Sequence, residues 1–333
     1  MRLLVLGGTD FVGWAVAEEG VARGWDVTTL SRGTHAPPPG TRALVGDRRE
    51  QDGLGVLGTE SWDIIVDTWS WEPSVVRDTV QLLADRVGRY AYISSISVQS
   101  WPKDALADES WPTVEASADD TGFADYARAK RGSEIAVEAK LGDRSLILRP
   151  GLILGPRENI GRLPWWLTRM ALGGDVLAPA PAAASFQYID ARDLARFTLD
   201  GLENGLSGSY SVVNEADTTT MGQLLDAARS ITGDRATLRW VSAQAILDAG
   251  IEPWTDLPIW VPLGADHDAM HRSSVSRALA AGLAVRPLEQ TVADTWSWLQ
   301  SIGGTAPQRP DRPAPGLDPE RERAVLAAHP DAD

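Results

Sequence analysis

A tyrosine and a lysine one helical turn apart could together perform acid–base chemistry. The string "DYARAK" places Tyr126 and Lys130 four residues apart, and therefore on one face of a predicted helix at 123–141. An ammonium beside a phenol favours the phenolate and brings its pKa from about 10 toward working pH. Such a phenol can pass a proton to or from a carbonyl or alcohol oxygen. The spacing predicts a proton-transfer pair, although it also arises by chance on helices.

Two serines precede this pair at the edge of a predicted sheet. Ser94 and Ser95 lie in the string "YISSISVQS", where an apolar run predicts a strand at 89–95. Because α/β folds bind ligands at the carboxyl ends of their parallel strands, we expect both hydroxyls to lie near the tyrosine.

A glycine-rich turn near the N-terminus adds a third feature. In "VLGGTDFVGWAV" a short strand leads into Gly7, which suits a tight turn, while Gly13 allows a helix to pack closely on the sheet. The middle position of this dinucleotide-binding fingerprint is Asp10 rather than glycine. We expect Asp10 or Thr9 to cap the helix that begins at Phe11. The alternative is that Asp10 binds the adenosine ribose, which would favour NAD.

The end of the second predicted strand bears on the choice of cofactor. An NAD-binding fold usually places Asp or Glu there to bind the ribose 2′-hydroxyl. The string "VTTLSRGTH" has Ser31 and Arg32 instead, and Arg32 can pair with a 2′-phosphate. These residues predict NADP(H) over NAD(H), the alternative being that Arg32 is a solvated turn residue.

Short apolar runs alternate with helical patterns in the first half of the chain, which is typical of a parallel sheet wound with helices. We predict strands at 2–6, 25–30, 42–45, 62–67, 89–95 and 144–149, and helices at 11–23, 73–87, 123–141, 220–232 and, capped by Asp318, 319–328. The predicted fold is α/β, a Rossmann-type, doubly wound, mostly parallel sheet with a smaller C-terminal substrate lobe. We assign a dinucleotide-binding domain to 1–150, a substrate-binding lobe to 151–303, from which segments can return to the sheet, and a Pro-rich tail with a short helix to 304–333.

The composition excludes several classes of protein. The 333 residues are 43% hydrophobic, enough for a large core, and the net charge of −15 argues against nucleic acid or an anionic membrane as partner. The absence of cysteine excludes disulfides, thiolate nucleophiles and Cys-ligated metals. No apolar run approaches the about 18 residues of a membrane span. We therefore expect a soluble cytoplasmic protein.

Together, these motifs resemble the short-chain dehydrogenase/reductase superfamily, in its extended or atypical, NAD-dependent epimerase/dehydratase-like branch. The resemblance rests on the strings "GGTDFVG", "GDRR", "YISSISV", "YARAK", "RPGLILGP" and "FQYIDARDLA", and it covers residues 1 to roughly 300. It implies that Ser95 orients the reacting oxygen, that Tyr126 is the acid and base, and that Lys130 tunes the phenol and holds the ribose. It further implies a cofactor site that includes Gly7, Thr9, Asp10, Phe11, Val12, Gly13, Ser31, Arg32, Asp47, Arg48, Asp67, Thr68, Trp69, Ser94, Tyr126, Lys130, Pro150, Leu152 and Ile153.

The resemblance leaves three functions open. The first is an NAD(P)-dependent oxidoreductase, an NADPH reductase, acting on a small-molecule carbonyl or alcohol. The second is a nucleotide-sugar epimerase that retains its cofactor; the related dehydratases carry an Asp-Glu pair after the serine, where this chain has Ile96 and Ser97. The third follows from a likeness to chloroplast stem-loop RNA-binding proteins, against which the net charge argues. A homodimer through the helices at 73–87 and 123–141 is also left open.

Several residues have two interpretations. His267 and His271 have the spacing of a metal pair, but without a third ligand we predict a solvated helix face and no metal. Five tryptophans either pack the small lobe or form a flat pocket for an aromatic or apolar substrate: Trp69, Trp71, Trp101, Trp165 and Trp166. Three arginines are candidates for binding a substrate phosphate, the alternative being ordinary surface arginines: Arg157, Arg162 and Arg192.

Overall fold

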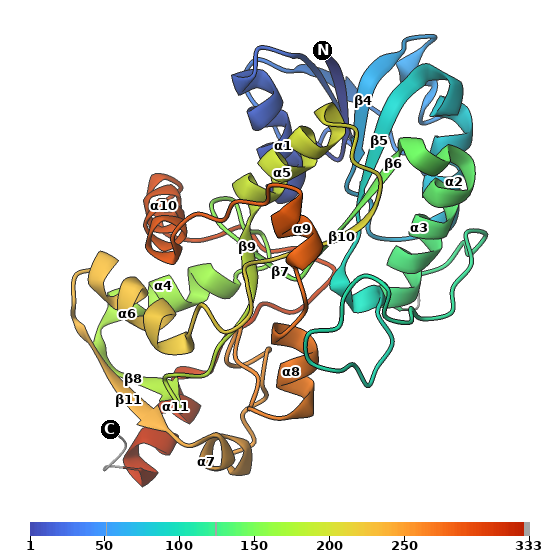
Figure 1. Cartoon of the computed structure of the whole chain (residues 1–333). Helices are drawn as coiled ribbons and strands as arrows, with labels where there is room; N and C mark the ends of the chain where they lie inside the picture. Colours follow the sequence, from blue (N-terminus) through green and yellow to red (C-terminus); the bar gives the residue numbers. More distant parts are fainter. Residues whose placement is uncertain (51, 124, 330–333) are drawn as a thin grey trace.

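A seven-stranded parallel sheet forms the upper part of the molecule in Figure 1. The computed structural model describes residues 1–50, 52–123 and 125–329. Neighbouring strands run parallel throughout the sheet. Their spatial order is β10 (Gly208–Val212), β6 (Ser145–Pro150), β5 (Val87–Ile93), β4 (Trp62–Asp67), β1 (Arg2–Leu6), β2 (Asp26–Ser31) and β3 (Arg42–Val45). The predicted Rossmann-type α/β fold is confirmed.

Helices cover both faces of this sheet, which explains why its central strands are apolar runs. Successive side chains of a strand point to opposite faces. Leu3 and Val5 of β1 pack with α1 (Phe11–Ala22) and α5 (Ala191–Glu203) on one face. On the other face, Leu4 and Leu6 pack with α2 (Pro73–Leu83) and α3 (Tyr126–Leu141). Parallel sheets are stable only when both faces are covered in this way.

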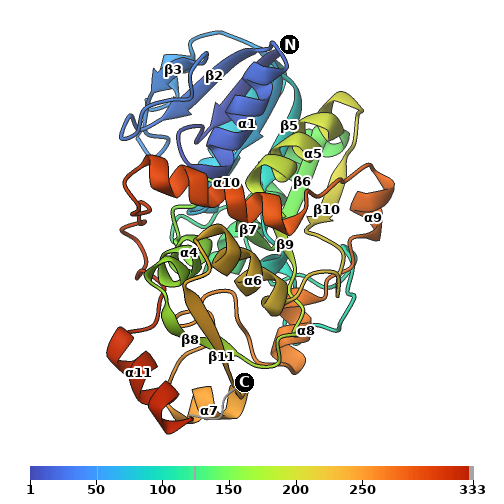
Figure 2. The same cartoon turned by 90° about the vertical axis from the view of Figure 1, so that its left-hand side faces the viewer.

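A second lobe lies below the sheet in Figure 1 and has an apolar core of its own around the fully buried Trp166. Its two-stranded parallel sheet consists of β8 (Gly174–Pro179) and β11 (Ala236–Val241). Besides α5, which covers the large sheet, the helices of this half of the chain are α4 (Arg162–Leu172), α6 (Met221–Ile231), α7 (Ala243–Asp248), α8 (Ala265–His271), α9 (Ser276–Ala280), α10 (Leu288–Ser301) and α11 (Pro319–Ala328). Figure 2 shows α10 lying across the boundary between the two lobes.

The chain passes between the lobes more than once. Between them, β7 (Leu152–Leu154) pairs in parallel with β9 (Tyr188–Asp190). The chain later returns from the second lobe to add β10 to the edge of the large sheet beside β6.

Two element ends near the serines and the tyrosine differ from the prediction. β5 ends at Ile93, so Ser94 and Ser95 follow the strand and lead into a short 3₁₀ turn at Ile96–Val98. α3 begins at Tyr126 rather than at 123, because the Asp125 carboxylate accepts the main-chain N–H of Arg128 and so caps the helix. Residue 124 lies outside the described residues.

The predicted cap of the C-terminal helix is confirmed. The Asp318 side chain accepts the main-chain N–H groups of Glu320 and Arg321, at 2.8 and 3.1 Å, where α11 begins. Within the described ranges, none of the helices is both long and apolar enough to cross a membrane.

Candidate active site

The glycine turn between β1 and α1 is closely packed around its own backbone. Gly7 has a φ of +92°, a conformation that residues with a Cβ rarely adopt. A Cβ on Gly13 would lie 2.1 Å from the main-chain oxygen of Gly7, so no larger residue fits there without a shift. Both glycines therefore act as the fingerprint predicts, and they bring the start of α1 to the carboxyl ends of the strands.

Asp10 does not cap α1, and that prediction is wrong. Asp10 occupies the N-cap position with extended backbone angles, but its side chain accepts none of the first N–H groups of the helix. Its carboxylate instead lies 2.7 Å from Nδ1 of His35, in the loop after β2, and both side chains are about half exposed. The positive end of α1 is therefore left for another partner. Uncapped N–H groups beside a tight glycine turn fit the pyrophosphate of a dinucleotide.

The end of β2 carries an arginine that is available for binding. The Ser31 hydroxyl accepts the main-chain N–H of Gly33 at 3.2 Å. Arg32 is exposed, and no ion pair joins it to another described residue. This arrangement suits a cofactor phosphate and equally suits the alternative of a solvated turn residue.

Arg48 and Asp67 bind each other at the carboxyl end of β4. Two guanidinium nitrogens of Arg48 lie 2.7 Å from the two carboxylate oxygens of Asp67, and both side chains are buried. The Tyr90 hydroxyl donates to the same carboxylate at 2.6 Å, and Arg48 also donates to Thr79. Although burial raises the pKa of Asp67, the charge and hydrogen bonds of Arg48 hold it below its ordinary value. These side chains stabilise the strand end, and their contact with a cofactor stays a prediction.

Arginines and tryptophans stack in the loops beside this ion pair. Trp69 and Trp71 meet edge to face with their ring centroids 5.3 Å apart. The Arg49 guanidinium lies 5.3 Å from the Trp69 ring and 5.5 Å from the Trp71 ring. Asp47 accepts the main-chain N–H of Arg49 through its side chain, which fixes the turn that carries this arginine. The Thr68 hydroxyl donates to the main-chain oxygen of Leu6 at 2.9 Å and so ties β4 to β1.

The two serines after β5 have different partners. Ser94 is buried and donates at 2.6 Å to Glu134, which forms a buried ion pair with Arg149. The Ser95 hydroxyl instead accepts the main-chain N–H of Ser97 at 3.1 Å, at the start of the 3₁₀ turn. Ser94 therefore belongs to the packing of α3 on the sheet, while Ser95 lies at its carboxyl edge.

Lys130 is buried and directs its ammonium at main-chain oxygens. Its Nζ donates to the oxygen of Trp69 at 2.7 Å and to that of Ile93 at 2.6 Å. It also lies 4.8 Å from the centroid of the Tyr92 ring. Burial lowers the pKa of Lys130 from 10.5 to about 7. Lys130 thus ties the ends of β4 and β5 together, and no hydrogen bond joins it to Tyr126 among the described residues.

Tyr126 is the accessible member of this group, with 38% of the residue exposed. Burial of the phenol raises its pKa, whereas interaction with the Ser95 hydroxyl lowers it. Three guanidinium groups lower the pKa further through their charge, those of Arg312, Arg309 and Arg162. Two of these arginines come from the tail at 304–333, to which the sequence pattern assigned a Pro-rich stretch and a short helix but no part in the site. The string "PQRPDRP" contains these two arginines three residues apart, and this was the feature of the sequence that could have indicated a charged site.

The segment after β6 places Pro150, Leu152 and Ile153 at the same edge of the sheet. Pro150 ends β6, and the chain continues directly into β7, where Leu152 is buried and Ile153 is half-buried. A surface cavity of about 470 Å³ opens next to this edge, between the turn after β5 and the start of α3. Ser97, the half-exposed Trp101 and Arg128 line it.

The five tryptophans that the sequence assigned to packing or to a substrate pocket lie in different places. Trp166 belongs to the core of the second lobe and donates to the main-chain oxygen of Pro258 at 2.8 Å. Trp165 packs against that core, while Trp101 lies at the cavity. Of the five tryptophans, Trp166 therefore has a purely packing role.

The prediction of a solvated face at the two histidines of α8 is wrong. His267 and His271 are buried rather than solvated, and the His271 ring packs against Phe186 and Trp254. Burial lowers the pKa of His271 to about 3, so it is neutral. Among the residues that the structure describes, no group of three His, Cys, Asp or Glu side chains is placed to hold a metal ion.

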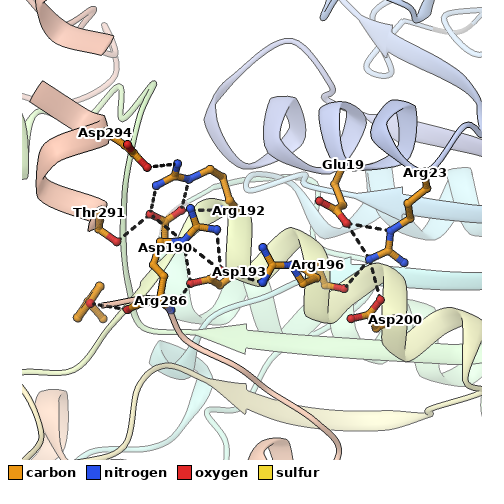
Figure 3. A network of polar contacts seen from close by, with 11 residues as sticks. Glu19, Arg23, Asp190, Arg192, Asp193, Arg196, Asp200, Arg286, Thr291 and Asp294 are labelled. Atoms are coloured by element: carbon orange, nitrogen blue, oxygen red, sulfur yellow. Dashed lines mark hydrogen bonds and ion pairs between the residues drawn. The ribbon is translucent and has the colours of Figure 1, made fainter. Parts of the chain in front are cut away.

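Arg192 is used within the fold and is not free to bind a phosphate. It forms hydrogen bonds with Asp190, which caps α5, and with Asp294 of α10 (Figure 3). The buried Asp190 also accepts the Thr291 hydroxyl at 2.9 Å. The string "FQYIDARDLA" thus supplies the residues that fasten α10 to α5.

Comparison with known proteins gives a family and a fold. A family model described as the NAD dependent epimerase/dehydratase family matches residues 3–214. A search of curated protein sequences finds no significant match.

Solved structures with the same fold have low sequence identity to this chain. UDP-glucose 4-epimerase from Thermus thermophilus, in complex with NAD, is 18% identical with a TM-score of 0.63, and the match covers 90% of this chain and 99% of that one. UDP-glucuronic acid 4-epimerase from Bacillus cereus, in complex with NAD, is 12% identical with a TM-score of 0.65, covering 91% and 99%. UDP-N-acetylglucosamine 4-epimerase from the same organism is 15% identical with a TM-score of 0.64, covering 90% and 99%. These similarities show the fold alone.

Proposed function

Since the chain belongs to the NAD-dependent epimerase/dehydratase family, we propose that it inverts a hydroxyl-bearing carbon of a nucleotide sugar with a nicotinamide dinucleotide as cofactor. The observation that carries the proposal is the accessible Tyr126 phenol beside Ser95, at the strand ends that also carry the glycine turn. The neighbours solved as nucleotide-sugar epimerases favour this function over the NADPH reductase that the sequence first suggested.

The residues available to hold the cofactor fit a dinucleotide. The uncapped start of α1 with Gly7 and Gly13 would receive the pyrophosphate. An ammonium has three donors, and two of those of Lys130 are used on main-chain oxygens, so the third can reach a ribose hydroxyl. When bound, the nicotinamide accepts and returns the hydride.

Tyr126 would take the proton of the substrate hydroxyl while its carbon is oxidised and give a proton back on reduction. Ser95 would hold the same oxygen by a hydrogen bond. The positive charges of the nearby arginines favour the phenolate that the first step needs, and they offset part of the burial that holds the pKa of Tyr126 above its ordinary value. Inversion requires hydrogen to return to the opposite face of the carbon, so the sugar must turn while another part of the substrate stays bound.

Loss of water from the sugar is disfavoured by the residues after Ser95. Such an elimination needs a carboxyl group to move protons at the neighbouring carbon. Ile96 and Ser97, which follow Ser95 in the 3₁₀ turn, supply none.

Three finer predictions accompany the proposal. A preference for NADP(H) over NAD(H) is supported by the exposed Arg32 and by the absence of an acidic residue at the end of β2. A cytoplasmic location, and a homodimer through α2 and α3, rest on the sequence alone.

Product analysis with nucleotide sugars tests the proposal. The purified protein is incubated with UDP-glucose or UDP-glucuronic acid and either dinucleotide, and the sugar is examined by NMR while reduced cofactor is followed by absorbance. We expect an epimer to accumulate with no net change in reduced cofactor. Stoichiometric oxidation of NADPH with simple carbonyl compounds, and no epimer, would identify a reductase instead.

A further inference from the structure

The tail after α10 packs against the beginning of α4 and is part of the fold. The Arg309 main-chain N–H donates to the oxygen of Asn159 at 3.1 Å, and that of Gly316 donates to the oxygen of Thr255 at 2.9 Å. A Cβ on Gly161 would lie 2.4 Å from Nε2 of Gln308, which shows how closely the two segments meet. Figure 2 shows the red segment descending from α10 beside α4 to α11.

The far end of the tail is anchored by a buried carboxylate on α11. Glu322 is 4% exposed, pairs with Arg169 at 2.7 Å and accepts the main-chain N–H of Leu177 in β8 at 3.0 Å. With both ends held, the residues between them have a defined position beside the site.

Arg309 connects the tail to the layer that holds Lys130. Its guanidinium lies 5.1 Å from the ring of Trp71, which meets Trp69 edge to face. Asp311 binds Arg309 through two hydrogen bonds of 2.9 and 2.7 Å. The charge of Arg309 contributes to lowering the pKa of Lys130, behind the larger effect of burial. Arg309 is therefore close to the buried ammonium although 179 residues separate them in the sequence.

Neither Arg312 nor Arg162 forms an ion pair with a carboxylate of the described residues. Nε of Arg312 is buried and has no hydrogen bond among these residues. The Arg162 guanidinium packs 4.7 Å from the ring of Trp254. Desolvation is the largest effect and lowers the pKa of both arginines; the charge of Glu158 offsets part of it at Arg162, and that of Asp311 offsets part of it at Arg312. The charge of Arg312 lowers the pKa of Arg162 further, and the charge of Arg309 lowers that of Arg312. Like charges gathered in a partly buried place destabilise a protein unless an anion joins them.

The remaining carboxylate nearby does not fill this role. Glu158 is fully buried at the start of α4, where it accepts the main-chain N–H groups of Arg162 and Leu163 at 2.7 and 3.1 Å. Its oxygens are thus directed at the helix rather than at the guanidinium groups. In a chain whose net charge is −15, this leaves a local excess of positive charge beside Tyr126.

We propose that Arg162, Arg309 and Arg312 form a binding site for an anionic group, a carboxylate or a phosphate, that the substrate carries close to the carbon facing Tyr126. The guanidinium fork matches both groups, because each offers two oxygens to parallel N–H donors. The inference deepens the proposed function, since it specifies a substrate with a negative charge near the reacting carbon. It also gives the tail a role, because two of the three arginines come from it.

Titration with simple anions tests the site without any assumption about the reaction. Inorganic phosphate and acetate are titrated calorimetrically into the wild type and Arg312→Gln, in the presence of NAD. Arg312 has no ion pair to lose and the substitution removes one of several like charges, so the variant should unfold at the wild-type temperature or slightly above it. We expect at least one anion to bind and to lose about tenfold or more in affinity in the variant. The anion that binds distinguishes a phosphate site from a carboxylate site.

Arg323→Ala is the matched control, because it removes the same charge from the same end of the chain. The Arg323 side chain is 71% exposed, and its nearest carboxylate, that of Glu320, is 3.9 Å away. The Arg323→Ala variant should bind the anion with the same affinity as the wild type. Anion binding that is absent, or equal in all three proteins, would overturn the proposal.

A pair of nucleotide sugars then locates the anion. UDP-glucose and UDP-glucuronic acid differ only in a hydroxymethyl or carboxylate group beside the reacting carbon. We expect Arg312→Gln to lower the affinity for UDP-glucuronic acid by about tenfold and to leave the affinity for UDP-glucose unchanged. Equal weakening of both would place the arginines on the shared diphosphate and contradict the proposed position. If neither sugar binds but the simple anion is still lost in Arg312→Gln, the anion site stands and the nucleotide-sugar function fails.

Discussion

The Nζ atom of Lys130 lies 2.7 Å from the main-chain oxygen of Trp69, the second residue after β4. This hydrogen bond, with a second one to Ile93, holds a buried ammonium between the ends of two strands. Lys130 therefore stabilises the ends of β4 and β5, whereas the sequence predicted that it tunes the Tyr126 phenol and holds the ribose. Its pKa of about 7 means that the folded protein can release this proton near neutral pH.

The stability of the wild type relative to Lys130→Met should consequently depend on pH. Between the folded pKa of about 7 and the ordinary value of 10.5, the unfolded chain binds more protons than the folded one. The contribution of Lys130 to the free energy of unfolding is therefore lowest below pH 7 and rises with pH, by about 1 kcal/mol per unit and at most about 1.4 kcal/mol. Urea unfolding of both proteins at several pH values above neutrality measures the difference. A difference that does not vary with pH would show that Lys130 keeps its proton.

Tyr126→Phe should separate proton transfer from cofactor binding. The substitution keeps the ring and removes the hydroxyl, so turnover should fall by about 10² to 10⁴. Cofactor affinity should change little, because the substitution leaves the aromatic ring, the glycine turn and Lys130 in place. Ser95→Ala should likewise reduce turnover at nearly constant cofactor affinity. Single-turnover kinetics and a cofactor titration give the two readouts, and wild-type turnover by Tyr126→Phe would eliminate this mechanism.

Arg32→Ala should reveal the cofactor preference. If Arg32 pairs with the 2′-phosphate, the wild type binds NADPH about tenfold or more tightly than NADH, since a charge-assisted hydrogen bond is worth about 1.5–3 kcal/mol. The alanine variant should lose this advantage and bind NADH as the wild type does. Titration of both reduced dinucleotides into both proteins decides the matter. Tighter NADH binding by the wild type would favour the alternative in which Asp10 meets the ribose.

Features encoded over a few neighbouring residues were predictable from the sequence. The strand, turn and helix around Gly7 and Gly13 follow from local apolar patterning and from the need for backbone without a Cβ. The placement of Tyr126 and Lys130 follows from helical spacing. Asp318 was recognisable as a cap because capping concerns only the next three residues.

Features that depend on distant partners were not predictable. The Asp10 carboxylate pairs with His35, in the loop after β2, and does not bind the N–H groups of the helix. Ser94 is bound by Glu134 of α3, so only one of two adjacent serines remains at the site. The tail arginines come near Tyr126 because α11 docks on β8, a contact with no signature within the tail itself. Local propensity cannot anticipate such tertiary partners.

Substitution of Asp190, the cap of α5, should destabilise the protein far more than substitution of an exposed carboxylate within α5. Asp190 is fully buried, pairs with Arg192 and accepts the Thr291 hydroxyl of α10. Asp190→Ala leaves buried donors without partners and should cost about 3–5 kcal/mol.

Asp200→Ala is the control for this substitution. Asp200 pairs with Arg23 at 2.7 Å, but its side chain is 48% exposed, so the loss should stay below about 1 kcal/mol. Denaturant unfolding followed by circular dichroism measures both variants. Because α10 leads directly into the tail, Asp190→Ala should also weaken binding of the anion proposed for Arg312, whereas Asp200→Ala should not. Equal, small effects of the two substitutions would show that Asp190 does not fasten α10 to α5.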